Sequence, residues 1–314
     1  MSSKRFWTAV KALATLGMVG VVLWKVPLRE VGSRLAQLGP MDIALLVLVT
    51  VAQVGTGVVR WWRLLRRLGE RVPFTSLFGD TLVGLLYNMF LPTAVGGDVV
   101  RAWRASKRVT RAHCAWSTSL YERLAGLVAM ALSGALAATV AVGTLVRVPS
   151  SVRGLSLGLA VVLVVLFFAA STPFRMLVRL LERRIPAAAV GELAGIVEDL
   201  EGGLATAGAR TEALGWSLLY QALGVVFVLV GARALGAPGH TVAIVVGVPL
   251  VHILSMIPVT LGGHGLREGL FVGVLGELGV APEVALGLAA QWLMSSLGFA
   301  LAGGVVVLLR REGT

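Results

Sequence analysis

Two stretches of this sequence repeat one combination of residues, the pattern P-x-x-x-G-G-x-x-x-R. Paired glycines allow a close approach of backbones, and proline ends one helix and suits the start of another. Backbone amides freed at a broken helix carry the positive end of the helix dipole, and arginine adds a permanent, planar cation. The pattern therefore predicts a site for an anion, with phosphate as the favoured ligand. Its two copies lie 166 positions apart and consist of Pro92, Gly96, Gly97 and Arg101, and of Pro258, Gly262, Gly263 and Arg267.

Further polar residues accompany the two copies. Asp98 and His264 occupy the equivalent position in each, and Glu268 follows the second arginine. An aspartate here can act as a counter-ion or as a proton acceptor, and histidine titrates near neutral pH, so protons are a candidate coupling ion. Asn88 lies one turn before the first proline, where it either caps the broken helix or binds the ligand.

Glu122 and Arg123 lie inside an apolar segment, where ionisable side chains are rare and usually functional. Neighbours in sequence do not share a helix face, so a pairing of these two with each other is awkward. We expect them to reach Arg101 or Asp98 and the second copy of the pattern. The structural alternative is an ion pair that locks the helices together.

Several kinds of active site are not indicated. Cys114 is the one cysteine, and the four histidines are scattered along the chain, so the spacing predicts no metal site. No nucleotide-binding loop and no Ser-His-Asp arrangement is recognisable. We therefore expect no catalytic residues, no bound metal and no cofactor.

The composition is that of a multi-pass membrane protein. Of 314 residues, 57% are hydrophobic and 14% charged, and the mean hydropathy is +0.87. The net charge of +12 fits basic loops at the negative cytoplasmic leaflet. Because the basic residues are not interleaved with aromatic ones, we expect no nucleic acid partner.

Eight main apolar segments stand out along the chain. The third has basic residues on both flanks, which places both of its ends on the cytoplasmic side. We therefore expect it to form a re-entrant hairpin over 74–100 that does not cross the membrane. The segments cover about 6–25, 41–59, 74–91, 114–146, 155–171, 213–232, 239–261 and 284–309.

The positions of the arginines along the chain predict on which side of the membrane each loop lies, and therefore a full topology. Both termini are expected in the cytoplasm, and 239–280 forms a second hairpin that enters from the opposite face. The predicted fold is an all-α, polytopic membrane helix bundle with inverted repeats, about six full spans and two broken-helix hairpins, as in many secondary transporters. Residues 1–314 form one integral membrane domain, with repeats at 1–146 and 155–309.

Residues 172–212 are expected to form a cytoplasmic amphipathic connector between the repeats, with interfacial helices broken at Pro186. A solvated connector is the favoured interpretation, and a sensor of lipid headgroups is the alternative.

The sequence resembles the lysylphosphatidylglycerol synthase transmembrane family, also called flippase-like integral membrane proteins. The resemblance rests on three blocks, NMFLPTAVGGDVVR at 88–101, ER at 122–123 and IPVTLGGHGLRE at 257–268. The best-known members fuse this region to a soluble aminoacyltransferase domain, and their membrane part moves the lipid product between leaflets. Stand-alone members are thought to act on polyprenyl-linked or other lipids. Because this chain ends soon after its last apolar segment, we do not expect the synthase activity.

The sequence thus predicts a flippase in the bacterial inner membrane that moves a phosphate-bearing lipid: a phospholipid, an aminoacyl-phospholipid or a polyprenyl-phosphate-linked lipid. Arg101 and Arg267 would bind the phosphate, while Asp98, Glu122 and Glu268 balance charge or relay protons. One alternative is a membrane enzyme acting on lipid phosphates, with Glu122 or His264 as general base. Another is a scaffold for a separately encoded lipid synthase or glycosyltransferase. Assembly as a homo-oligomer stays open.

Overall fold

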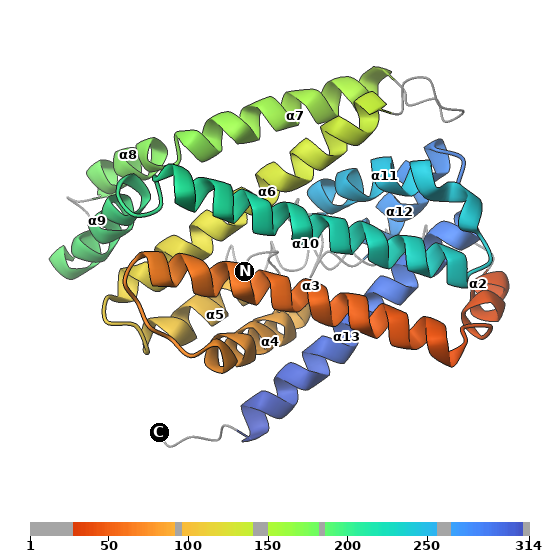
Figure 1. The fold of residues 1–314 in the computed structure, drawn as a ribbon, viewed down its shortest axis with the longest axis horizontal. Coiled ribbons are helices and arrows are strands. Elements are labelled where there is room, and N and C mark those ends of the chain that lie inside the picture. The colour runs from red at the N-terminus through yellow and green to blue at the C-terminus, as the bar shows by residue number, and fades with distance from the viewer. Residues whose placement is uncertain (1–27, 92–95, 141–149, 182–185, 256–264, 310–314) are drawn as a thin grey trace, which may run out of the picture.

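The computed structural model describes residues 28–91, 96–140, 150–181, 186–255 and 265–309. This part of the chain is helical, with no strand within those ranges, which confirms the all-α prediction (Figure 1). The predicted first span, 6–25, lies outside the described residues. The helices are α2 (Leu28–Leu35), α3 (Pro40–Arg67), α4 (Phe74–Phe90), α5 (Gly96–Ser106), α6 (Ala112–Val140), α7 (Ser150–Phe168), α8 (Ser171–Leu181), α9 (Ala187–Glu201), α10 (Ala207–Ala234), the 3-10 turn η1 (Pro238–His240), α11 (Thr241–Leu254), α12 (Leu266–Glu277) and α13 (Pro282–Leu309).

Four described helices, α3, α6, α10 and α13, are long and apolar enough to cross a membrane. A helix of 28 residues reaches about 42 Å, more than the hydrocarbon core of about 30 Å. Helices α7 and α8 together pass the same test but bend by 64° at their junction, so the described chain holds up to five spans. The predicted total of six spans stays a prediction. Large apolar side chains such as Leu301, 73% exposed, face outward, as expected for contact with lipid.

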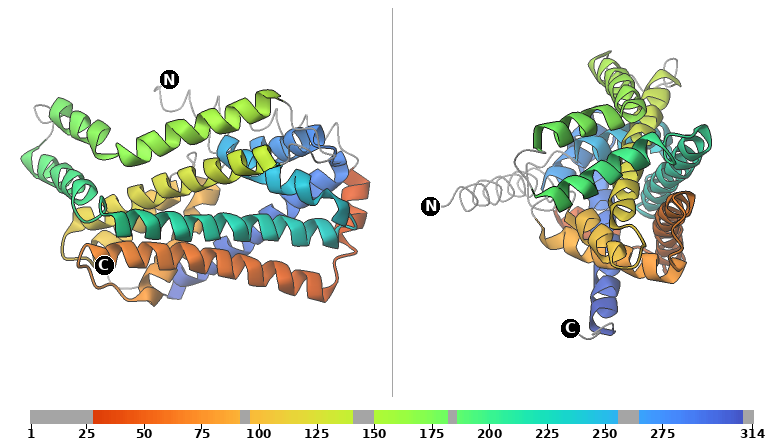
Figure 2. Two further views of the ribbon diagram at one scale, coloured as in Figure 1. Left: turned by 45° about the horizontal axis from the view of Figure 1, so that its top comes forward. Right: turned by 90° about the vertical axis from the view of Figure 1, so that its left-hand side faces the viewer.

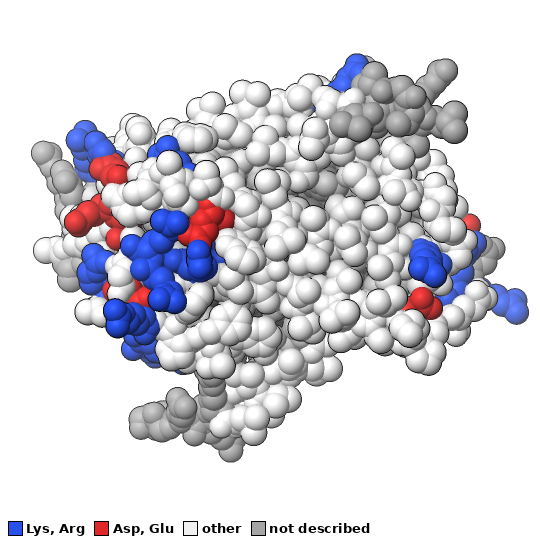
Figure 3. All heavy atoms as spheres, in the orientation of Figure 1, with Lys and Arg blue, Asp and Glu red and all other residues white. Residues whose placement is uncertain are grey.

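On the face of the molecule shown in Figure 3, the charged side chains gather at the two ends of the bundle and leave a broad uncharged band between them. Helices α3 and α10 pack side by side along this band (Figures 1 and 2). Glu212 near the start of α10 pairs with Arg63 and Arg67 near the end of α3. The end of α3 and the start of α10 therefore lie together at one end of the bundle, which we call the basic end.

Two pairs of short helices occupy the predicted hairpin positions. Helix α4 packs against α5, and α11 packs against α12. Helices of 17, 11, 14 and 12 residues span only about 17–26 Å each, less than the hydrocarbon core. The α4–α5 pair lies toward the basic end of the bundle and the α11–α12 pair toward the other (Figure 1). The inverted repeat itself stays a prediction. The two tips, 92–95 and 256–264, lie outside the described residues.

Glycines let α4 approach two neighbours at backbone distance. A Cβ on Gly84 would lie 2.7 Å from the carbonyl oxygen of Gly97 in α5, and a Cβ on Gly97 would overlap the Gly84 carbonyl. On its other side, α4 meets Gly303 of α13, where a Cβ would overlap the Leu82 carbonyl. Small residues commonly allow such close helix packing in membranes. The position of α4, and of the hairpin it begins, therefore depends on these three glycines.

The predicted connector contains two helices, α8 and α9, with Pro186 at the N-cap of α9. Helix α9 packs against α6. Helix α8 turns large apolar side chains outward, including Met176 at 64% and Leu180 at 63% exposed, and carries Arg175 and Arg179. The structure confirms the break at Pro186.

The glycine contact between α13 and α4 gives a direct test. Gly303→Ala should lower the thermal midpoint of the detergent-solubilised protein, because the new methyl group meets backbone that cannot move away, at a cost of about 1–3 kcal/mol. The matched control is Gly304→Ala, since a Cβ on Gly304 has nothing within 4 Å. Equal midpoints for the two variants would contradict the packing described here.

Candidate functional site

Five charged side chains form an alternating chain inside the bundle, which we call the charge cluster: Arg60 of α3, Glu122 and Arg123 of α6, and Asp98 and Arg101 of α5. Arg60 donates to one Glu122 carboxylate oxygen from Nη2 at 2.6 Å and Nε at 3.0 Å. Arg101 Nη2 donates to the other oxygen at 2.8 Å. Asp98 then pairs with both Arg101 and Arg123. Each carboxylate is thus held between two guanidinium groups, and three helices meet at the cluster.

The centre of the charge cluster is almost fully buried. Glu122 is 1% exposed, and Arg60 and Arg101 are 8% exposed. Removing charges from water is costly unless each one has partners. Ser217 accepts a further hydrogen bond from Arg60 at 2.6 Å, and the Arg101 guanidinium lies 4.7 Å from the centroid of the Trp61 ring. Three arginines against two carboxylates leave the cluster with one surplus positive charge.

One nitrogen of Arg101 is not fully used. Its Nε lies 3.1 Å from Asp98 Oδ1, yet it forms no hydrogen bond with any described residue. The distance qualifies as an ion pair, but the direction of the N–H does not suit a hydrogen bond. The attraction between Arg101 and Asp98 is therefore mainly charge to charge, and the Nε–H is buried without a hydrogen-bond acceptor among the described residues.

Two adjoining cavities open beside the charge cluster. The first, of about 220 Å³, is lined by the cluster itself, and we call it the cluster cavity. The second, of about 200 Å³, is lined by Arg267 of α12, and we call it the Arg267 cavity. They share four lining residues, so they lie side by side between α3, α4 and α10: Val54, Leu85, Asn88 and Tyr220.

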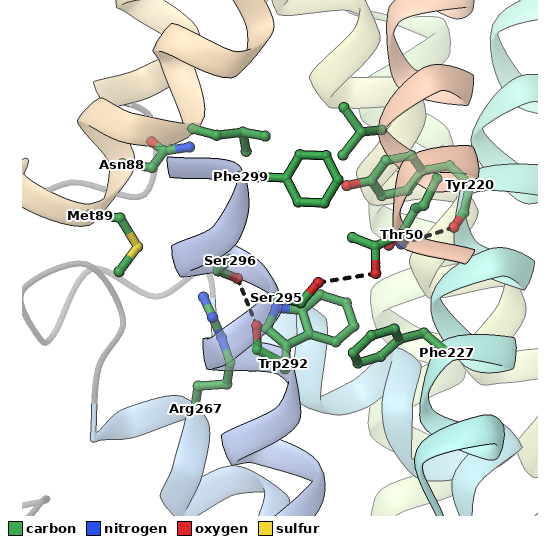
Figure 4. Close-up of a pocket in the computed structure, with 13 residues that line it drawn as sticks. Thr50, Asn88, Met89, Tyr220, Phe227, Arg267, Trp292, Ser295, Ser296 and Phe299 are labelled. Carbon is green, nitrogen blue, oxygen red and sulfur yellow. Dashed lines mark hydrogen bonds between the residues drawn. The ribbon is translucent and has the colours of Figure 1, made fainter. Parts of the chain in front are cut away.

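Arg267 differs from Arg101 in its surroundings. It points into its cavity toward Ser296 (Figure 4), and among the described residues no hydrogen bond or ion pair engages it. The neighbouring Glu268 accepts a hydrogen bond of 2.6 Å from the backbone amide of Gly265, at the start of α12. Gly265 has φ of +78°, a conformation that favours glycine. Glu268 therefore caps the helix and does not line the Arg267 cavity.

Asn88 lies at the junction of the two cavities. Its Oδ1 accepts a hydrogen bond of 2.7 Å from the backbone amide of Gly97, in the first turn of α5. Two roles were considered for Asn88, capping of the broken helix and binding of the ligand, and this hydrogen bond corresponds to capping. Gly96 and Gly97 open α5 as expected. The other predicted site residues, Pro92, Pro258, Gly262, Gly263 and His264, lie outside the described residues.

The expected contacts of Glu122 and Arg123 with the first hairpin are present, with Arg101 and Asp98 respectively. Sequence reasoning missed Arg60, which we assigned to the cytoplasmic flank of the third segment. The available signal was its depth in the membrane segment, because Arg60 directly follows the apolar run of 41–59, one turn before Arg63 and two turns before Arg67. Sequence reasoning did not single out Asp80 either, which is fully buried and pairs with Arg104 and Arg108.

A second polar cluster ties α9 to α6. His113, Cys114 and Asp199 place their potential ligand atoms within 4.8 Å of one another, although the sequence spacing predicted no such group. Asp199 accepts from Ser117 at 2.6 Å and lies 3.0 Å from His113 Nδ1. The carboxylate is thus satisfied by protein groups, and the cluster serves to join the two helices. Spacing could not reveal it, because Asp199 follows Cys114 by 85 positions.

Glu70 joins the two loops that lead into and out of the first hairpin. Its carboxylate accepts hydrogen bonds from the backbone amides of Thr110 at 2.7 Å and Arg111 at 3.2 Å. Burial alone would raise the pKa of Glu70, but these hydrogen bonds and the Arg111 charge outweigh it and hold the pKa below the ordinary value of 4.5. The ionised carboxylate therefore stabilises the base of the hairpin.

A family model described as "Lysylphosphatidylglycerol synthase TM region" matches residues 8–304, nearly the whole chain. No protein of curated function matches the sequence. The match includes both copies of the repeated pattern and all residues of the charge cluster.

The charge cluster predicts a large effect of one neutral substitution. Glu122→Gln should destabilise the protein by about 3–5 kcal/mol, because it leaves two buried arginines without their shared partner. The matched control is Glu201→Gln, which breaks the exposed pair with Arg175 and should cost less than about 1 kcal/mol. Thermal midpoints of both variants check this, and a Glu122→Gln midpoint no lower than that of the control would contradict it.

The Glu70 contacts predict a dependence on pH. A carboxyl group whose pKa is lower in the folded than in the unfolded protein stabilises the fold above its unfolded pKa, and this stability is lost as the pH falls through the folded pKa. Glu70→Gln should therefore lower the thermal midpoint at pH 7. The difference from the unsubstituted protein should shrink as the pH falls below 4.5. A difference that stays constant across this range would argue against the assignment.

Proposed function

The chain belongs to the lysylphosphatidylglycerol synthase TM region family, and from this premise we propose that it moves an anionic, phosphate-bearing lipid between the leaflets of the membrane. The family and the apolar helices make it a multi-pass membrane protein that acts on lipids. The proposal goes further in two respects: the protein would transport the lipid between leaflets, and the lipid would bear a phosphate. It also includes six full spans, two re-entrant hairpins that enter from opposite faces, and an inner-membrane location with both termini in the cytoplasm.

One observation carries the proposal. An arginine from each short-helix pair, Arg101 of α5 and Arg267 of α12, lines one of two adjoining cavities. Together the described lining residues of the cavities include four arginines and two carboxylates, which leaves a positive surplus. Buried positive charge without a partner is costly, and an anionic group would remove that cost. A lipid phosphate could do so while its acyl or prenyl tails stay in the surrounding bilayer.

The two arginines would act in different ways. Arg267 would bind the phosphate first, because no described carboxylate is paired with it. Arg101 would join by exchanging part of its contact with Glu122 and Asp98 for the phosphate oxygens, a change that keeps its charge paired. The carboxylates would then balance the arginines in the empty state, and a proton on Asp98 or Glu122 would weaken that balance and favour release of Arg101 to the lipid.

Alternating exposure of the site would come from motion of the hairpins. Described residues of both short-helix pairs line the cavities, Asn88 and Arg101 from the first pair and Arg267 from the second. A shift of one pair would open the site toward one side. The backbone caps made by Asn88 and Glu268 would keep the second arm of each hairpin intact during the shift.

Substitution of Arg267 tests the transport proposal. In vesicles with phosphatidylglycerol carrying a reducible fluorophore on one acyl chain, Arg267→Gln should slow translocation by about 10–100-fold, the value of a lost charge-assisted contact. Its thermal midpoint should not fall, since no described residue depends on Arg267 for a bond. The matched control is Arg233→Gln, at the exposed end of α10, which should leave transport unchanged.

Two outcomes of this experiment would point elsewhere. Undiminished translocation by the Arg267→Gln variant would remove Arg267 from the site. Mass spectrometry of the lipids after the assay covers the alternative of a membrane enzyme, because chemical conversion of the headgroup by the purified protein would favour catalysis over transport.

A further inference from the structure

The Arg267 cavity is selective in charge. Among the described residues that line it, Arg267 is the one charged side chain, and no carboxylate takes part. In the adjoining cluster cavity, Asp98 and Glu122 are each already held by two arginines. An ammonium group bound here would find no free carboxylate and would lie close to the Arg267 guanidinium. Burial of an unpaired charge beside a like charge is strongly unfavourable.

The polar wall of the same cavity mainly accepts hydrogen bonds. The hydroxyl groups of Thr50 and Ser296 donate to backbone carbonyls of their own helices at 2.7 and 2.9 Å, and Ser295 donates to Thr50 at 3.0 Å. Each hydroxyl has a single proton, so its oxygen is left as an acceptor. Gln53 donates through Nε2 at 3.2 Å, and no described residue bonds its Oε1. These oxygens suit a ligand that offers O–H donors.

Aromatic rings complete the cavity. Tyr220, Phe227, Trp292 and Phe299 lie along one side, and Arg267 and Asn88 lie on the other (Figure 4). Trp292 packs edge to face against Phe227, with ring centroids 5.4 Å apart. The negative face of an aromatic ring attracts weakly positive C–H groups. A ligand with a C–H face and a rim of hydroxyl groups would match both the rings and the acceptors.

We propose that the headgroup taken by this site is a phosphate diester of a neutral, hydroxyl-rich group, a polyol or sugar, and that amine-bearing headgroups are excluded. The phosphate binds Arg267, the hydroxyl groups donate to Thr50, Ser295 and Ser296, and the carbon face lies against the rings. This inference rests on the proposed function and narrows its substrate. It separates polyol- and sugar-phosphate lipids from aminoacyl-phospholipids.

Binding to the detergent-solubilised full chain tests the inference without any transport step. Native mass spectrometry would compare phosphatidylinositol, which has a hydroxyl-rich ring, with phosphatidylethanolamine and lysyl-phosphatidylglycerol, which bear amines. Phosphatidylmethanol has the same charge as phosphatidylinositol but no headgroup hydroxyl. Phosphatidylinositol should bind at least about tenfold more tightly than each of the others. Equal binding of an amine-bearing lipid, or of phosphatidylmethanol, would overturn the proposal.

A designed change of charge gives a sharper test. Ser296→Asp would place a carboxylate in the cavity next to Arg267, and Ser296→Asn is the matched control of the same size without the charge. Only the aspartate variant should gain binding of phosphatidylethanolamine, by about tenfold. No gain, or an equal gain in both variants, would show that charge balance in this cavity does not select the headgroup.

The two proposals can fail separately. A chain that binds phosphatidylinositol selectively but moves no lipid in vesicles would keep the headgroup assignment and refute transport. A chain that moves amine-bearing lipids as fast as phosphatidylinositol would keep transport and refute the headgroup assignment.

Discussion

The interaction on which this structure most depends is the Glu122 carboxylate held between Arg60 and Arg101. One buried anion joins α3, α5 and α6, and it does so within a bundle whose outer surface is apolar. In such surroundings neither arginine could be buried without a partner, and the carboxylate could not be buried without both. The cluster therefore fixes the place of α5, and through α5 the place of the first hairpin.

A second constraint comes from the short helices. A helix that ends inside the membrane must satisfy its free backbone amides with protein groups. Here each second arm has a side-chain cap: Asn88 binds the amide of Gly97 in α5, and Glu268 binds the amide of Gly265 at the start of α12. In the first pair the capping residue, Asn88, belongs to the facing helix α4. In the second pair the capping residue, Glu268, belongs to the capped helix α12 itself.

Much of this arrangement follows from the sequence, because basic residues mark helix ends and an ionisable residue in an apolar segment needs a partner. These two rules were enough to expect the contact of Glu122 with Arg101, which the structure contains, and to predict two hairpins where the structure has two pairs of short helices. They failed for residues whose sequence context fits two environments, a buried one and an exposed one. Arg60 follows an apolar run and precedes two exposed arginines, so only its burial in the fold distinguishes it from a flanking charge. Asp199 and His113 belong to distant segments, and nothing local indicates that α9 returns to α6.

The repeated pattern led us to expect equal roles for Arg101 and Arg267, and their surroundings argue against this. Arg101 contacts two carboxylates, while no described carboxylate pairs with Arg267. The same residue type at the same position of a repeat is thus ion-paired in one copy, whereas in the other copy it is attracted by Glu268 without forming an ion pair with it. An anion would gain most at Arg267 and would have to compete with Glu122 and Asp98 at Arg101. A symmetric pattern in sequence therefore gives two arginines in unlike surroundings. In the proposed transport, Arg267 would be the first contact of the ligand and Arg101 the second. Such an order is what a protein needs if it binds a headgroup from one side and releases it to the other.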